Sequence, residues 1–340
     1  DGIRDQPRSR GLGDVYKRQL KRMSLMKNFI TLQDLVDLKK TIALAKSCKE
    51  DPFANAHLGQ RKTIGLLFFN PSLRTRLSTQ KAARNLGLDV MVMNFSNEAW
   101  AIEYENETIM SSLRSEHVKE AAQVVSQYCD FVAIRAFASL TDKKRDEEEQ
   151  VLRKFAEFAT IPIINMESAT AHPLQALADG LTIQEQVTVK KPKIVMSWAP
   201  HPKALPHAVA NSFIGLMNHK EADFVITHPE GYDLNPAIVG NHTVNYNQEE
   251  ALADADVVYV KNWCSYTNYG AILRTDNEWM MTADKMKHTN DAFFMHCLPI
   301  RRNVVASDDV LDHPKSLVIE QANNRTFAAQ AVLQEFLTHG

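Results

Sequence analysis

The chain has 340 residues, which is enough for two compact domains with cores of their own. Hydrophobic residues make up 44% of it and charged residues 24%, the composition of an ordinary soluble globular protein. The formal net charge of -2 gives no global basic field for nucleic acid or an anionic membrane, and no apolar run approaches the roughly 20 residues of a membrane span.

The first 22 residues differ in character from the rest. They are polar, rich in Gly and Arg, and lack the apolar stretch of a secretory signal. We interpret residues 1–22 as an extension outside the fold, so that Met23 or Met26 is the natural start. A short basic targeting arm is the alternative interpretation.

From Met26 onward, strand-like and helix-like runs alternate, which is typical of α/β architecture. Helices are predicted over 32–50, 77–87, 118–129, 146–160 and 173–187, and strands over 61–70, 89–95, 130–137 and 161–166. After a predicted hinge at 190–193, the alternation restarts through 193–199, 207–219, 222–228, 255–263, 292–297 and 316–322, and it ends with an amphipathic helix over 325–340. This pattern predicts two α/β domains of similar size, each built on a parallel sheet, with a cleft between them.

The segment 72–76, Ser-Leu-Arg-Thr-Arg, is the strongest local signal. It lies where a predicted buried strand ends and a helix begins, and a helix N-terminus is an anion site because its N–H groups are unpaired. Ser72 and Thr75 add hydroxyl groups, and Arg74 adds a planar guanidinium suited to phosphate. A capped surface helix with stray arginines is the other interpretation. The scarcity of glycine favours a small phosphate over a dinucleotide.

Three further segments lie at predicted carboxyl ends of strands, where open α/β sheets bind ligands. They are Arg135, the H-P-L-Q of 172–175, and the H-C-L-P of 296–299. A lone His in such a place is more often structural than catalytic. Adjacent residues of a strand point to opposite faces, so His296 and Cys297 are not expected to form a nucleophile pair.

The four cysteines lie far apart along the chain and form no C-x-x-C pair. This spacing argues against a zinc site and fits a reducing cytoplasm. We therefore expect a cytoplasmic protein without a metal. The cysteines are Cys48, Cys129, Cys264 and Cys297.

The chain resembles the aspartate/ornithine carbamoyltransferase family in three motifs. They are S-L-R-T-R after a strand, then H-P-L-Q, then H-C-L-P, in this order and at these distances. The similarity covers about 26–340 and is closest to the N-acylornithine branch, in particular the members that act on N-succinylornithine. Matching segments include FFNPSLRTRLSTQKAARNLG, NMESATAHPLQ, WAPHP, FVITHPEGY, VKNW and HCLPIRRN. The resemblance implies a carbamoyl phosphate-binding domain of 23–170 with the final helix 323–340, and an acylornithine-binding domain of 188–318.

The resemblance also implies roles for single residues. Its carbamoyl phosphate ligands are Ser72, Leu73, Arg74, Thr75, Trp100, Arg135, His172, Gln175, Cys297, Leu298 and Arg325. Among them, the implied catalytic residues are Arg74, Thr75, Arg135, His172, Gln175 and Arg325. Cys297 and Leu298 are implied to act through backbone carbonyls, so the thiol is a bystander. No metal and no organic cofactor are implied.

The second substrate is implied by a departure from the ornithine enzymes. Those enzymes have an Asp before a V-W-x-S-M-G run to hold a free α-ammonium group, whereas this chain has Lys261 followed by N-W-C-S-Y. A lysine repels an ammonium group and attracts a carboxylate, as expected if the α-amine is acylated. The implied acylornithine ligands are Ser115, Glu167, His201, Lys261 and Arg301. The structural alternatives are a helix N-cap charge for Glu167 and a solvated strand end for Lys261.

Two loop residues bear on assembly and specificity. In relatives, the tryptophan at position 100 reaches into a neighbouring subunit, so the resemblance implies a homotrimer with shared active sites. Position 115 is Pro in succinyl-type and Glu in acetyl-type relatives, but here it is Ser115, and 111–113 replaces a D-G-D-like stretch. Because of these departures, the sequence does not decide whether the substrate carries a succinyl or an acetyl group.

The resemblance implies carbamoyl transfer from carbamoyl phosphate to the side-chain amine of N-succinylornithine, which gives N-succinylcitrulline and phosphate in arginine biosynthesis. N-acetylornithine is the alternative substrate. A non-catalytic transcarbamylase-like binding protein is a further alternative, although the motifs that should decay in such a protein are intact. A phosphate-binding dehydrogenase is disfavoured, because no glycine fingerprint follows the first strands.

Overall fold

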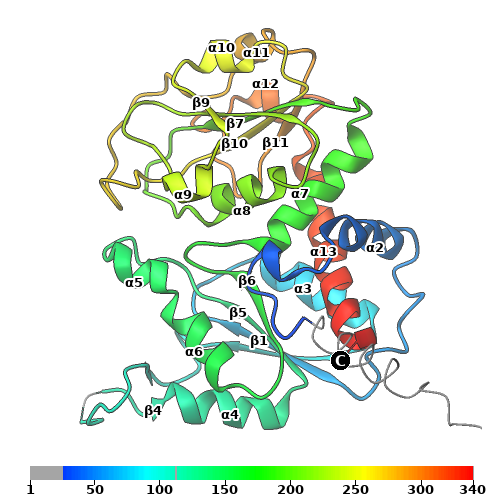
Figure 1. Ribbon diagram of the computed structural model, residues 1–340, viewed down its shortest axis with the longest axis vertical. Helices are drawn as coiled ribbons and strands as arrows, with labels where there is room; N and C mark the ends of the chain where they lie inside the picture. Colours follow the sequence, from blue (N-terminus) through cyan, green and yellow to red (C-terminus); the bar gives the residue numbers. More distant parts are fainter. Residues whose placement is uncertain (1–25, 112, 340) are drawn as a thin grey trace, which may run out of the picture.

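The computed structural model describes residues 26–111 and 113–339, so the predicted extension of 1–22 lies outside the described residues. The chain forms two lobes stacked along the long axis of the molecule, each with a parallel sheet flanked by helices (Figure 1). The predicted α/β architecture with two sheets is therefore confirmed.

The first sheet has the order β2-β1-β5-β6, with all strands parallel. Its strands are β1 (Thr63–Phe68), β2 (Asp89–Asn94), β5 (Phe131–Arg135) and β6 (Ile163–Glu167). The apolar runs of β1, β5 and β6 are buried on both faces, as expected for strands inside a parallel sheet, whereas the edge strand β2 is only partly buried. Backbone bonds from Phe29 cover the edge of β6.

Helices and a small two-stranded sheet complete the first lobe. They are η1 (Leu32–Asp34), α2 (Leu38–Glu50), α3 (Arg74–Asn85), α4 (Val118–Tyr128), α5 (Lys143–Glu148) and α6 (Gln150–Phe158), with β3 (Ile102–Glu103) paired to β4 (Glu116–His117).

Two helices predicted as continuous are interrupted. The helix predicted over 32–50 is broken because the Asp37 carboxylate accepts a bond from the Lys40 N–H and starts α2 there. The helix predicted over 146–160 is broken at Glu149, which has φ 47°. Its buried carboxylate accepts bonds from Thr170, so a tertiary contact holds the break.

The second sheet has the order β11-β10-β7-β8-β9, again parallel. Its strands are β7 (Lys193–Trp198), β8 (Asp223–Thr227), β9 (Thr243–Asn245), β10 (Val257–Lys261) and β11 (Phe293–Met295). The remaining helices are α7 (Pro173–Gln186), α8 (Ala208–Met217), α9 (Pro236–Val239), α10 (Gln248–Leu252), α11 (Ala283–Met286), α12 (Asp308–Leu311) and α13 (Val318–His339).

The end of the chain differs from the expected pattern. The segment 316–322 was expected to continue the alternation separately from the final helix, but α13 already begins at Val318. Only Ser316 makes a bridge to β11. The strand predicted over 292–297 also ends early, because the His296 N–H donates to the Gln321 side chain and not to a neighbouring strand.

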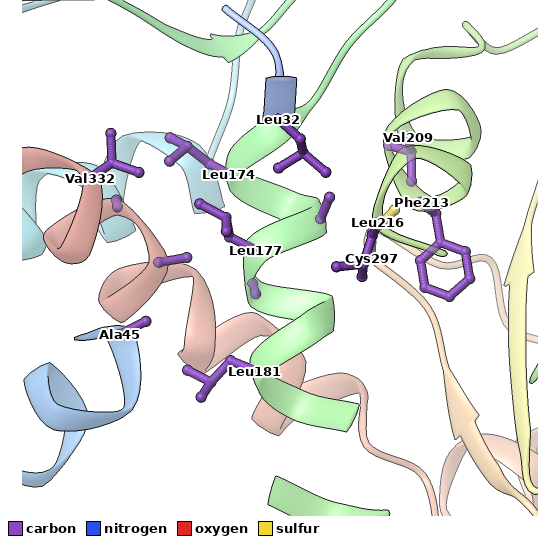
Figure 2. Packing of buried hydrophobic residues seen from close by; sticks show 14 of the residues in the cluster. Leu32, Ala45, Leu174, Leu177, Leu181, Val209, Phe213, Leu216, Cys297 and Val332 are labelled. Atoms are coloured by element: carbon purple, nitrogen blue, oxygen red, sulfur yellow. The ribbon is translucent and has the colours of Figure 1, made fainter. Parts of the chain in front are cut away.

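Helix α7 connects the two sheets and lies at the centre of the core. Figure 2 shows Leu174, Leu177 and Leu181 of α7 between Val332 of α13 and Leu216 of α8. Nearly the whole length of α7 is buried, so both lobes pack on one helix. Within the described ranges, no helix has both the length and the apolarity needed to cross a membrane.

Each sheet has a point where the chain turns from one side to the other, between β1 and β5 and between β7 and β10. Ligands of open α/β sheets bind outside the carboxyl ends of strands at such points. The predicted site segments follow those strand ends in both lobes.

Gly87 provides a test of the packing behind α3. It has φ +81°, and a Cβ there would lie 2.1 Å from the carbonyl oxygen of Ala56. Gly87→Ala should lower the free energy of unfolding by about 2–5 kcal/mol, because left-handed strain adds to overpacking. Gly240→Ala is the control, since Gly240 has φ +58° and no atom within 4 Å of a Cβ. Urea unfolding of both variants should show a clearly larger loss for Gly87→Ala, and equal losses would contradict the described packing.

Candidate active site

A cavity of about 540 Å³ lies where the carboxyl ends of the two sheets face each other. Every site residue inferred from the sequence lines it except Trp100 and Ser115. The first lobe contributes Ser72, Leu73, Arg74, Thr75, Arg135, Glu167, His172 and Gln175, the second contributes His201, Lys261, Cys297, Leu298 and Arg301, and α13 contributes Arg325.

The N-terminus of α3 forms one end of the cavity. No side chain of the described residues caps it, so its first N–H groups are available to a ligand. The Nη1 group of Arg135 donates to the carbonyls of Asn70 (3.1 Å) and Pro71 (2.8 Å) and so fixes the loop before the helix. The Nε of Arg74 is buried and has no hydrogen-bond partner among the described residues. These groups together form an anion site.

Arg325 joins three helices above this anion site. It is only 4% exposed, and its Nη2 donates to Thr75 Oγ1 (2.9 Å) while its Nη1 donates to Gln175 Oε1 (3.1 Å). Burial lowers the pKa of the Arg325 guanidinium, but an arginine keeps its charge in proteins. Its buried Nε finds no partner in the described part of the chain.

His172 is buried at the N-cap of α7. Its backbone N–H donates to Ser212 Oγ (2.7 Å), and its Nε2 lies 3.5 Å from Glu167 Oε2. Burial, and then the nearby cations led by Arg325 and Arg135, hold the pKa of His172 well below 6.5. The imidazole is therefore neutral at pH 7, with one N–H donor and one acceptor nitrogen.

The second lobe faces the cavity with cations. Lys261 ends β10 and is 8% exposed, and its Nζ makes no hydrogen bond or ion pair within 26–111 and 113–339. The solvated strand end weighed for Lys261 is therefore wrong. Arg301 Nε donates to His201 Nε2 (3.2 Å), so His201 Nδ1 carries the proton and donates to the Lys203 carbonyl (2.8 Å). Burial lowers the pKa of His201, which agrees with this neutral tautomer.

Positive charge dominates the cavity. Glu167 is the only carboxylate among the lining residues described, and its Oε2 accepts a bond from Arg135 Nε (3.1 Å). Glu167 ends β6, and the N-cap of α7 is His172, so the helix-cap role weighed for Glu167 is wrong. Because the other charged lining residues are cations, the cavity fits a multiply charged anion. They are Arg74, Arg135, Lys261, Arg301 and Arg325.

Cys297 is buried, and its burial raises the pKa of the thiol. The strand ends at Met295, so the argument that His296 and Cys297 point to opposite faces of a strand does not apply. The Leu298 N–H donates to His296 Nδ1 (2.9 Å), which turns the 296–298 loop. A protonated thiol is a weak nucleophile, so the environment disfavours thiol chemistry for a different reason.

Trp100 and Ser115 do not line the cavity; Trp100 lies just before β3 and Ser115 just before β4. Trp100 is 59% exposed and its Nε1 donates to Glu116 Oε2 (2.7 Å), while the Ser115 N–H donates to the Ala101 carbonyl (3.1 Å). Ile109, between them in the chain, is also exposed.

The cavity also has an apolar wall that was not predicted from the sequence. This wall carries no sequence signal, because the pattern of apolar residues does not distinguish one that lines a cavity from one in the core. Its members are Phe137, Leu205, Pro206, Ala208, Val209 and Pro299.

The pH dependence of stability tests the buried neutral histidines. Burial, and then Lys261 and Arg74, hold the pKa of His296 well below 6.5. The unfolded chain takes up a proton there below pH 6.5 and the folded chain does not, so folding stability falls as the pH drops. His296→Asn keeps an acceptor for the Leu298 N–H. It should reduce this loss by up to about 1.4 kcal/mol per pH unit between pH 6.5 and 5.5. Urea unfolding with an unchanged pH slope would contradict the neutral state of His296.

Comparison with known proteins gives the family of this site. Residues 27–185 match the family described as aspartate/ornithine carbamoyltransferase, carbamoyl-P binding domain, and residues 206–336 match its Asp/Orn binding domain. The chain is 49% identical to the N-succinylornithine carbamoyltransferase of Bacteroides thetaiotaomicron over 92% of this chain and 99% of that protein. It is 34% identical to the N-acetylornithine carbamoyltransferase of Xanthomonas campestris over 91% and 97%.

Solved structures agree. An N-acetyl-L-ornithine transcarbamylase in which one glutamate is replaced by serine, complexed with carbamyl phosphate and N-succinyl-L-norvaline, has a TM-score of 0.86 at 34% identity. An acetylornithine transcarbamylase complexed with acetylcitrulline has a TM-score of 0.84 at 34% identity. Each match covers 90% of this chain and 98% of the other. The chain therefore belongs to the aspartate/ornithine carbamoyltransferase family and is a carbamoyltransferase.

Proposed function

We propose that this enzyme transfers the carbamoyl group of carbamoyl phosphate to the side-chain amine of N-succinylornithine, giving N-succinylcitrulline and phosphate in arginine biosynthesis. The observation that carries the proposal is the cavity with five cations and one carboxylate, whose cations lie in both lobes. A phosphate dianion and a substrate with two carboxylates match this excess of positive charge. The 49% identical relative that bears this activity in its name supports the same substrate.

Carbamoyl phosphate would lie against the first lobe. The N–H groups of α3, the hydroxyls of Ser72 and Thr75, and Arg74 would hold the phosphate. The carbonyl oxygen would receive donors from His172 and Arg325, whose buried polar atoms include some without a described partner.

The carbamoyl amide group needs acceptors. Gln175 Oε1 and the backbone carbonyls of Cys297 and Leu298 would supply them. These residues line the same cavity from opposite lobes, so the group would be held between them.

The reaction needs an uncharged amine and a stabilised oxyanion. The amine lone pair forms a bond to the carbamoyl carbon, and the negative charge moves to the carbonyl oxygen. Each donor aimed at that oxygen contributes roughly 3–4 kcal/mol to the transition state. The bond from carbon to the phosphate oxygen then breaks, and the leaving phosphate accepts the amine proton. A dedicated general base is therefore not required.

The acylornithine would lie against the second lobe. Lys261 is buried and unpaired among the described residues, so it would bind a carboxylate and repel a free α-ammonium group. His201 and Arg301 lie beside it and are hydrogen-bonded to each other. This arrangement disfavours unmodified ornithine. Glu167, at the boundary with the phosphate side, would contact the same substrate.

The acyl group is the finer question. By the resemblance, the glutamate of acetyl-type relatives falls at position 115, where this chain has Ser115. A glutamate would bring a like charge near a succinyl carboxylate, and serine would not. A glutamate-to-serine variant of an acetylornithine transcarbamylase is complexed with N-succinyl-L-norvaline, which supports the succinyl substrate here. N-acetylornithine is the second candidate, because 34% identical relatives bear that activity.

Trp100 and Ser115 would act on the active site of a neighbouring subunit in a homotrimer. Neither residue lines the cavity of its own chain, which supports this arrangement, as do the exposed apolar side chains of Trp100, Ile109 and Leu113 within residues 100–113. We also assign the final helix to the carbamoyl phosphate-binding domain, because α13 packs on α2, α3 and α7.

Substrate choice is tested by phosphate release from carbamoyl phosphate with ornithine, N-acetylornithine and N-succinylornithine. The highest kcat/KM should be found with N-succinylornithine. Ser115→Glu should lower the preference for it over N-acetylornithine by about fivefold to 30-fold, since one added charge repulsion is worth roughly 1–2 kcal/mol. No release with any amine would contradict the function. A native preference for the acetyl substrate would contradict the succinyl assignment. An unchanged preference in Ser115→Glu would show that position 115 does not determine the choice of acyl group.

The phosphate site is tested by two arginines of the same helix. Arg74→Ala should lower kcat/KM by 30-fold or more, since losing one partner of a buried charged pair costs about 2–5 kcal/mol. Arg76→Ala is the control, because Arg76 donates to Asn94 outside the cavity. Cys297→Ser should keep most activity because only the backbone carbonyl is used. An active Arg74→Ala enzyme or a folded but inactive Cys297→Ser enzyme would refute these assignments.

A further inference from the structure

Asp179 lies behind the proposed carbamoyl site, one helical turn after Gln175 on α7. It is 1% exposed, and its Oδ1 accepts two hydrogen bonds of 2.7 Å each, one from Gln175 Nε2 and one from Gln321 Nε2. It does not line the cavity, and its Oδ2 has no hydrogen-bond partner among the described residues. Removing a carboxylate from water costs free energy, which its hydrogen bonds only partly offset. A buried carboxylate at this position therefore calls for a functional explanation.

The first bond fixes which way the Gln175 amide points. Burial raises the pKa of Asp179 to about 6, so the carboxylate is ionised at pH 7.5 and can only accept hydrogen bonds. Gln175 must then turn its NH2 group toward Asp179. Its Oε1 consequently points to Arg325 Nη1, and that oxygen keeps a second lone pair for another donor.

The opposite amide orientation would be unproductive. With the amide flipped, the Gln175 NH2 group would face the Arg325 guanidinium, and two donors would oppose each other. The same NH2 group would also face the carbamoyl NH2 of the substrate. Asp179 therefore selects the orientation in which Gln175 accepts a bond from the substrate.

The second bond connects Asp179 to Gln321, and Gln321 in turn bonds to the second lobe. Gln321 of α13 donates to Asp179, and its Oε1 accepts the backbone N–H of His296 (3.0 Å). His296 begins the loop whose next two carbonyls, those of Cys297 and Leu298, belong to the proposed amide-binding side. One carboxylate thus holds both walls of the amide pocket.

We propose that Asp179 is a positioning residue that orients the Gln175 amide and, through Gln321, the 296–298 loop, so that both accept hydrogen bonds from the carbamoyl NH2 group. The inference rests on the proposed carbamoyl phosphate site. Asp179 does not touch the substrate; it acts through Gln175 and Gln321. Its role is therefore in recognition of the amide end and not of the phosphate end.

The experiment separates those two ends with a pair of stable probes. Phosphonoacetamide carries a phosphonate and a carboxamide, and methylphosphonate carries the phosphonate alone. The Kd of methylphosphonate divided by the Kd of phosphonoacetamide reports recognition of the amide. Both values are measured by calorimetry at pH 7.5 on the intact protein, and this quotient is the ratio used below. Since no turnover is involved, the ratio does not depend on the identity of the amine substrate.

Asp179→Leu removes the acceptor but keeps the branching at Cγ, and it should lower the ratio at least tenfold, with the Kd of methylphosphonate within about threefold of the wild-type value. Asp179→Asn should restore the ratio to within about threefold, because its Oδ1 still accepts both bonds and its NH2 group can face the neighbouring Tyr259 hydroxyl. Because Asn has the size of Asp but no charge, this recovery would show that the hydrogen-bond acceptor, and not the negative charge, is what the site requires.

Thr182→Val is the matched control. Thr182 Oγ1 accepts a bond from Asn324 Nδ2 (3.0 Å), so it links the same two helices about one turn farther along α7. Its loss should leave the ratio unchanged. If Asp179→Leu does not fold, Gln321→Met gives the second test, because it cuts the connection to His296 and should lower the ratio at least threefold.

Three outcomes would overturn this inference without affecting the proposed function. They are an unchanged ratio in Asp179→Leu or Gln321→Met, a ratio in Asp179→Asn as low as in Asp179→Leu, and an equal loss in Thr182→Val. A wild-type protein that binds phosphonoacetamide no better than methylphosphonate would overturn both this inference and the proposed carbamoyl site.

Discussion

The buried guanidinium of Arg325 is the interaction on which the site depends. It bonds to Thr75 at the start of α3 and to Gln175 in the first turn of α7, although the three residues are far apart in the chain. A buried cation must be hydrogen-bonded and balanced by negative charge, and both requirements restrict how α3, α7 and α13 pack. The long packed contacts of α13 with the other two helices keep this geometry in place.

Excess positive charge in the cavity has two consequences. It favours anions, and it keeps the buried histidines neutral, because protonation would add a charge to a site that is both desolvated and already positive. Burial is the larger cause for His172 and His296, and the neighbouring cations act in the same direction. Cys297 has the complementary behaviour: burial raises its pKa against the influence of Lys261. The site therefore supplies neutral and cationic hydrogen-bond donors without a reactive thiolate.

Much of this arrangement could be predicted from sequence, because parallel strands bring their carboxyl ends to one edge. Arg135, Lys261 and the H-P-L-Q segment all follow apolar runs, and the structure brings them to one cavity. The failures have local causes. Asp37 stops a helical pattern by capping, and the contact of Glu149 with Thr170 breaks another, and neither contact can be read from periodicity.

Asp179 shows a different limit of sequence reading. A single carboxylate inside a helical pattern resembles a solvated position, and only the packing of α7 against α13 shows that it is buried and holds two amides. Trp100 shows the reverse case. The family resemblance assigns it to an active site, but its own chain places it on an exposed segment. A role that requires another subunit cannot be found in the geometry of one chain.

The central claim is that one cavity binds the phosphate at the α3 N-terminus and the acylated amino acid at Lys261. A crystal structure with phosphonoacetamide and N-succinyl-L-norvaline bound together tests it most directly. The account predicts phosphonate oxygens within hydrogen-bond distance of Arg74 and of the first N–H groups of α3, and a norvaline carboxylate on Lys261. A phosphonate bound at Lys261, or the two ligands in separate cavities, would contradict the account.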